Sequence, residues 1–172
     1  MDNNKISEDL YTDIDFEDDE SKESKKTPEN IDIEDEIEEL LSDVGNKVTE
    51  FYSEDKSVLE KKIVEKKSGE TVEITYTLFG KKQTVTKKDK NNKIRKFVEY
   101  HINGVLKEMT EYGLDGSYKM LTYNIDGSWL TNITKHSDGT SDAIYYDADK
   151  NGTNLIVKMD KNKKVIEKRF EK

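Results

Sequence analysis

Apolar and polar residues alternate along most of the chain after residue 56, which is the pattern of β-strands. Val72, Ile74, Tyr76 and Leu78 occupy every second position, while threonines and Glu73 fill the positions between them. Because successive side chains of a strand point to opposite faces of a sheet, this alternation predicts strands with one apolar face. Between residues 118 and 159 the second face is also partly apolar, so we expect another layer to cover at least one face there.

Turn-forming residues interrupt the alternation at regular intervals. Asp-Gly and Asn-Gly pairs are strong hairpin signals, because a tight turn needs a residue with positive φ. Successive turns lie eleven to thirteen residues apart, and the one longer gap is divided by the turn-prone pair Asn91-Asn92. The turn glycines are Gly69, Gly80, Gly104, Gly116, Gly127, Gly139 and Gly152.

Together the strands and turns predict a mainly β fold. Turns this short join antiparallel neighbours, so we expect an extended antiparallel meander of eight to ten strands, built from hairpin repeats of about 23 residues. The expected strands lie near residues 57–66, 71–78, 82–88, 93–102, 105–112, 117–124, 128–136, 141–147, 153–160 and 164–171.

A helical pattern precedes the strands. Apolar residues recur at helical spacing over residues 32–54, Asp32 is placed to cap a helix, and Gly45 is a weak point where the helix would break. We expect this stripe to pack on the sheet, and a dimerising or partner-binding helix is the alternative. The expected domains are a disordered acidic tail (1–31), an amphipathic helix (32–54) and a repeat β-sheet (55–172). The stripe consists of Ile33, Ile37, Leu40, Leu41, Val44, Val48 and Phe51.

Composition limits the core and the compartment. Apolar residues make up 32% of the chain and charged residues 39%, so a thick double-layered core is hard to build. The chain has no cysteine, which excludes disulfides, thiolate chemistry and cysteine zinc sites. Its N-terminus has neither a basic start nor an apolar run, so we predict no signal peptide and no membrane span, and we expect a cytoplasmic protein.

Charge is unevenly distributed. Residues 1–43 carry 18 acidic and 4 basic residues, whereas residues 81–96 carry eight basic residues and one acidic residue. Such a basic segment can bind nucleic acid through phosphates, and such an acidic tail can imitate nucleic acid. The simpler interpretation is a solubilising tail and a solvated pair of strands.

Aromatic residues concentrate from residue 97 onward. Tyrosine at repeat positions is often structural, but exposed Tyr and Trp on a flat sheet are also typical of protein-binding surfaces. We therefore predict a partner-binding patch, in which alternation makes Trp129 the member most prone to face the helix instead. The predicted patch consists of Tyr100, Tyr112, Tyr123, Trp129 and Tyr146.

Catalytic and metal-binding signals are weak. Neither His101 nor His136 belongs to a partnered motif, so we predict no enzyme activity, no catalytic residue and no cofactor. Residues 147–152 match the first half of a calcium loop, but its twelfth position is Lys158 and no helices are expected around it. A hairpin turn is the favoured interpretation, and we predict no metal site.

The repeated phrases resemble those of a known family. EYHINGVLKEMTEYGLDGSYKMLTY and NIDGSWLTNITKHSDGT, within residues 97–152, are similar to bacterial MORN-like repeat proteins of antitoxin or immunity type. This resemblance implies a non-enzymatic binding scaffold that recognises another protein. The matching positions are Tyr100, Asn103, Gly104, Tyr112, Asp115, Gly116, Tyr123, Asp126, Gly127, Asp138 and Gly139.

Overall fold

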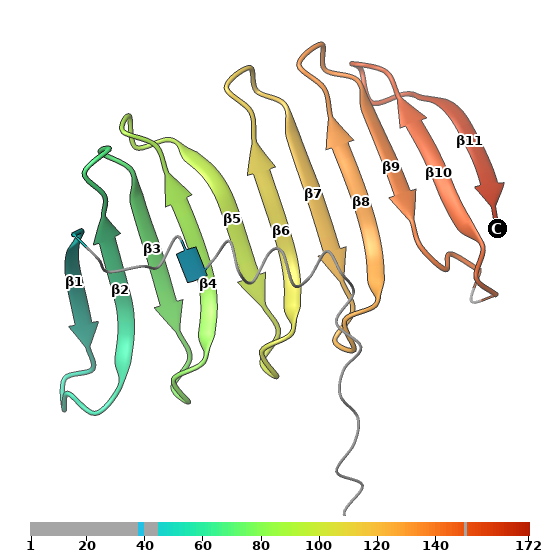
Figure 1. Cartoon of the computed structure of the whole chain (residues 1–172). Helices are drawn as coiled ribbons and strands as arrows, with labels where there is room; N and C mark the ends of the chain where they lie inside the picture. Colours follow the sequence, from blue (N-terminus) through green and yellow to red (C-terminus); the bar gives the residue numbers. More distant parts are fainter. Residues whose placement is uncertain (1–37, 40–44, 150) are drawn as a thin grey trace, which may run out of the picture.

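The structure, a computed structural model, describes residues 38–39, 45–149 and 151–172, and within them the chain forms one antiparallel sheet (Figure 1). Its eleven strands lie side by side in sequence order, which confirms the predicted mainly β meander, although the described part of the chain holds one strand more than the eight to ten predicted. The strands are β1 (Lys47–Tyr52), β2 (Leu59–Glu65), β3 (Thr71–Tyr76), β4 (Lys82–Lys88), β5 (Ile94–Tyr100), β6 (Leu106–Tyr112), β7 (Tyr118–Tyr123), β8 (Trp129–Lys135), β9 (Ser141–Tyr145), β10 (Asn154–Met159) and β11 (Val165–Glu171).

Most hairpins use the same turn. In the turn after β5, the amide of His101 donates to the carbonyl of Val105, and the amide of Gly104 donates to the carbonyl of His101. Gly104 has φ +90°, which is why glycine recurs at this place. The same pair of bonds recurs in the turns after β2, β3, β4, β7, β8 and β10. Asn92 and Lys163 hold the positive φ in the two of these turns that lack glycine there.

A tyrosine recurs every 23 or 24 residues, at the end of each odd-numbered strand from β1 to β9 or just after it. Four of these tyrosines coincide with an irregularity in strand register, so that the next strand carries an extra residue opposite the ring. Such a bulge bends and twists the strand locally. The repeating unit is therefore a hairpin with a tyrosine and a bulge near its turn. The tyrosines are Tyr52, Tyr76, Tyr100, Tyr123 and Tyr146.

The sheet has two faces of different character. We call face A the side that carries Val72 and face B the side that carries Glu73. Residues directly opposite each other on antiparallel strands share a face, so the register places Ile74, Val85, Val98, Met109 and Leu121 in one row across face A.

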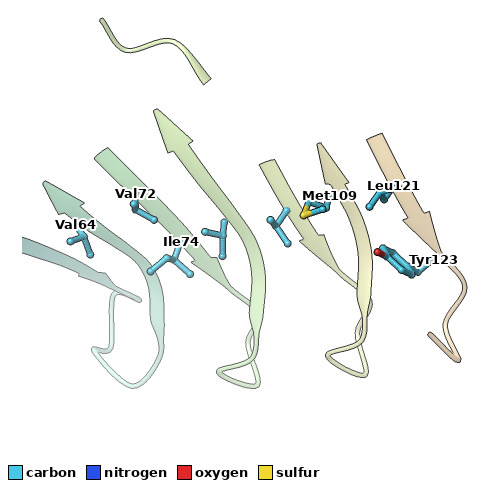
Figure 2. Close-up of a cluster of buried hydrophobic side chains, with 8 residues drawn as sticks. Val64, Val72, Ile74, Met109, Leu121 and Tyr123 are labelled. Atoms are coloured by element: carbon cyan, nitrogen blue, oxygen red, sulfur yellow. The ribbon is translucent and has the colours of Figure 1, made fainter. Parts of the chain in front are cut away.

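The hydrophobic core lies on face A. Figure 2 shows its side chains following one another across the strands. The exposed fractions of these residues are 0 to 7%. Packed against them are the partly buried Tyr76, Tyr100, Leu106 and Trp129. Burying one such aliphatic side chain is worth about 1.5–3 kcal/mol. The core residues are Val64, Val72, Ile74, Val85, Val98, Met109, Leu121 and Tyr123.

The prediction of a helix up to residue 54 is wrong for its last part. Residues 47–52 form β1, which pairs with β2, so the sheet begins eight residues earlier than the predicted boundary at 55. Gly45 adopts φ +73°, which ends any helix before it. Val48 then joins the core on face A, while Phe51 lies three residues on and therefore on face B. Glu38 and Glu39 are helical and exposed. The rest of the predicted helix and the predicted tail lie outside the described residues.

None of the helical structure described is long and apolar enough to cross a membrane.

Candidate functional surface

The five residues of the predicted aromatic patch do not share one surface. Tyr123 is 2% exposed within the core, and Tyr100 and Trp129 pack against that core on face A. The Trp129 ring lies 5.3 Å from the ring of Tyr123 and 5.4 Å from that of Tyr146, measured between centroids. Tyr112 alone lies on face B, where it is 40% exposed. Four of the five are therefore part of the packing around face A.

Face B carries a different set of apolar side chains, most of which the sequence prediction did not select. Phe97, Met120, Ile133 and Val157 belong to one row across β5 to β10, together with the smaller Thr110 and Ala143. A second row contains Tyr145, which is 37% exposed, Leu155, and Phe170, which is 60% exposed. We define the face B strip as Phe97, Tyr112, Tyr118, Met120, Ile133, Tyr145, Leu155, Val157 and Phe170.

One end of the face B strip borders a shallow open depression near the turns after β6 and β8. The rings of Tyr112 and Tyr118 lie 6.2 Å apart, and the Lys135 ammonium lies 5.9 Å from the centroid of the Tyr118 ring. Residues of the two turns, including Asp115 and Ser137, complete the lining. An aromatic pair beside a cation can contact both apolar and acidic groups of another protein.

The basic segment 81–96 does not form a single positive stripe. Lys87 and Lys96 are on face A, where they pair with Glu70 at 3.2 Å and Glu111 at 3.2 Å. On face B, Lys88 pairs with Glu73 at 3.4 Å. Arg95 contacts Asp89 at 2.5 Å. Half of the eight cations are thus neutralised by the chain itself and divided between two faces, an arrangement that does not favour a phosphate backbone as the ligand.

The two histidines have separate structural contacts. Nε2 of His101 lies 3.0 Å from the carbonyl oxygen of Tyr123, which ties the turn after β5 to the end of β7. Nε2 of His136 lies 2.8 Å from Oδ2 of Asp142, and both side chains are nearly half exposed. These contacts fix neighbouring turns and strands.

The turn that resembles a calcium loop is stabilised by its own backbone. Oδ1 of Asp147 accepts a hydrogen bond from the amide of Gly152 at 2.7 Å, and Oδ1 of Asp149 accepts bonds from the amides of Asn151 and Thr153. The hydrogen bond from the amide of Asn151, followed by the bonds from Thr153, lowers the pKa of the Asp149 carboxyl group. Across the residues that the structure describes, no cluster of three His, Asp or Glu side chains is arranged to hold a metal ion.

The sequence contained a signal for the tyrosine repeat, because the spacing of 23 or 24 residues from Tyr52 to Tyr146 is visible without coordinates. Only part of the face B strip had a sequence signal, the second apolar face between residues 118 and 159. The members of the strip lie on seven strands, β5 to β11. The bulges shift the alternation by one position, so counting every second residue does not show which face a residue occupies on the next strand.

Comparison with known proteins adds no assignment: no protein-family model matches the chain, and no curated protein matches it.

Proposed function

We propose that the protein is a non-enzymatic protein-binding module whose face B strip contacts a partner protein. The observation that carries this proposal is the accessibility of Tyr112, Tyr145 and Phe170 on face B, at 40, 37 and 60% exposure. Interface centres favour aromatic residues and Met over Lys and Glu, and contiguous exposed apolar surface marks interaction sites.

The hydrogen-bonded framework of the sheet supports the same proposal. Every strand of the sheet is hydrogen-bonded to its sequence neighbours, so the strip is held in place before a partner arrives. A preorganised surface loses little conformational entropy on binding. The MORN-like resemblance suggests the biological class, and we propose an antitoxin, immunity or phage-type inhibitor role in which binding blocks the partner.

The matched pair Tyr145 and Tyr146 tests the proposal. Tyr145 lies on face B opposite Leu155, whereas the ring of Tyr146 packs on Trp129. With a partner isolated from the native host, Tyr145→Ala should weaken binding by more than about 1 kcal/mol in calorimetry, because exposed interface aromatics are frequent hot spots. Tyr146→Ala should lower the melting temperature with a smaller effect on affinity. Equal binding by Tyr145→Ala, Tyr112→Ala and the parent chain would contradict the proposal.

A labelled DNA duplex separates this proposal from a nucleic-acid role. Phosphate contacts give an affinity that falls steeply with salt. Because Lys87, Lys88, Arg95 and Lys96 already pair with carboxylates, we expect no binding at low ionic strength. Tight, salt-sensitive duplex binding would instead favour the basic segment as the functional site.

A further inference from the structure

On β2 to β5, face A is more deeply buried than a single layer of strands can explain. Val64, Val72 and Val98 have 0% exposure, Ile74 has 1% and Val85 has 2%. On face B of the same strands, the larger side chains of Ile63 and Phe97 stay half-buried. Neighbouring strands flank a side chain but do not cover it. Side chains on the two faces of β2 to β5 should therefore be similarly exposed unless another part of the molecule covers one face. The cover of face A comes from outside the eleven strands.

The chain upstream of β1 has the length and the position to supply this cover. Apart from Tyr123 on β7, the side chains of face A with 0 to 2% exposure lie on β2 to β5, beginning next to the edge strand β1 that residue 45 leads into. A helix over residues 33–44 would be about 18 Å long at about 1.5 Å per residue. Four strand spacings of about 4.8 Å amount to about 19 Å. Such a helix, laid across the strands, reaches from β1 to β5.

The two described residues of this segment fit the required orientation. Glu38 and Glu39 are helical and both are exposed, and Figure 1 draws them as a short helical piece that overlaps β4 in that view. On a helix at 100° per residue, Ile37, Leu40 and Leu41 gather on one side and Glu39 points away from them. Exposed glutamates at 38 and 39 therefore leave the apolar side free to face the sheet.

Charge complementarity favours the same occupant. Lys96 is 5% exposed on face A, and its partner Glu111 is half-exposed beside it. Taking an ammonium group out of water is costly unless negative charge surrounds it. Lys62 and Lys87 lie on the same face. Residues 33–44 contain six acidic and no basic residues, and so present carboxylates around an apolar stripe.

We propose that residues 33–44 form an amphipathic helix that docks across β1 to β5 on face A, with its apolar stripe on the valine core and its carboxylates towards Lys62, Lys87 and Lys96. The helix makes the part of face A on β1 to β5 an internal surface of the molecule. Face B is then the face that remains for a partner, although the docking itself does not depend on partner binding.

Single cysteines placed in the full-length chain test this proposal, because the native sequence has none. Val85→Cys puts a thiol on face A, and Thr86→Cys puts one on face B at the next position of the same strand. The maleimide reaction rate of each thiol is measured in the parent chain and with Ile37→Asp and Leu41→Asp added. Glu39→Ala, at an exposed position, is the matched control in the segment.

The thiol of Val85→Cys should react slowly in the parent chain and with Glu39→Ala. Its rate should rise at least about tenfold with Ile37→Asp and Leu41→Asp, because a buried thiol reacts only when its cover opens. The rate of Thr86→Cys should stay unchanged. If the reaction rates of both thiols rise, the aspartate variants have unfolded the whole protein. The milder substitutions Ile37→Ala and Leu41→Ala are then used, and they must raise the reaction rate of Val85→Cys without raising that of Thr86→Cys. Persistent protection of Val85→Cys overturns the proposal, and protection that grows with protein concentration overturns it in favour of a second copy.

Discussion

Aspartate side chains in the turns connect local sequence to stability. Oδ1 of Asp126 accepts hydrogen bonds from the amide of Ser128 at 2.9 Å and from its hydroxyl at 2.7 Å. Asp115 and Asp138 make the same pair of bonds to the residue two positions later. In each case the hydroxyl bond, followed by the amide bond, holds the pKa of the carboxyl group below its ordinary value.

These turns predict acid sensitivity. Bonds from the hydroxyls of Ser53 and Ser57 and from the amide of Ser57 lower the pKa of Asp55 to about 2. A carboxyl whose pKa is lower when folded stabilises the fold above its unfolded pKa of about 3.9, and this stabilisation is lost as the pH falls through the folded value. The melting temperature should be level near neutrality and fall between about pH 4 and pH 2. Asp55→Asn should reduce that fall, and a melting temperature independent of pH down to 2 would contradict the prediction.

Turn residues with positive φ lead to a second prediction, which concerns the effect of their substitution on stability. Gly104 has φ +90° and open space where a Cβ would stand, so Gly104→Ala tests backbone strain alone. Left-handed backbone costs a residue with a Cβ about 1–2 kcal/mol, and we expect that loss in urea unfolding. Asn92→Gly, at φ +59° in an equivalent turn, should change stability by less than about 1 kcal/mol. A neutral Gly104→Ala would show that the turn rearranges.

At the scale of the strand, the tyrosine repeat and its bulges decide which side chains reach the core. Tyr123 faces Trp129 at the point where the register between β7 and β8 shifts, and its ring is fully enclosed. Tyr112 and Tyr118 pair across β6 and β7 without such a shift and lie on face B. Tyrosines eleven residues apart in the sequence therefore have different surroundings.

Alanine substitutions should separate these two kinds of tyrosine. Tyr123→Ala removes a buried ring and should cost about 3–5 kcal/mol, as large-to-small core changes do. Tyr112→Ala removes an exposed ring and its contact with the ring of Tyr118, and it should lower the free energy of unfolding by only about 0.5–1.5 kcal/mol. Urea unfolding followed by the fluorescence of the single tryptophan, Trp129, measures both. Similar losses in the two variants would mean that face B is as tightly packed as face A.

For the whole molecule, the sequence predicted the topology well and the functional surface poorly. Asp-Gly and Asn-Gly turns are local signals, so the meander and nearly all its strands could be found from them. Residues 47–52 were assigned to a helix because Val48 and Phe51 continue a helical spacing, and only pairing with β2 makes them a strand. The tyrosines were assigned to one surface because strand alternation cannot be followed across bulges that the sequence does not reveal.

The meander also predicts how stability is distributed. Each strand pairs only with its sequence neighbours, as in a repeat protein, so local unfolding can begin at an edge without opening the centre. The most deeply buried core residues lie on β2 to β7, whereas every residue of β11 except Glu167 is exposed. Hydrogen exchange should therefore be slowest for paired amides of β3 to β5 and fastest in β10 and β11. Gly104→Ala should accelerate exchange in β5 and β6 before β10, because its strain acts on that hairpin. Uniform exchange over all eleven strands would show that the sheet unfolds as one cooperative unit and would contradict this prediction.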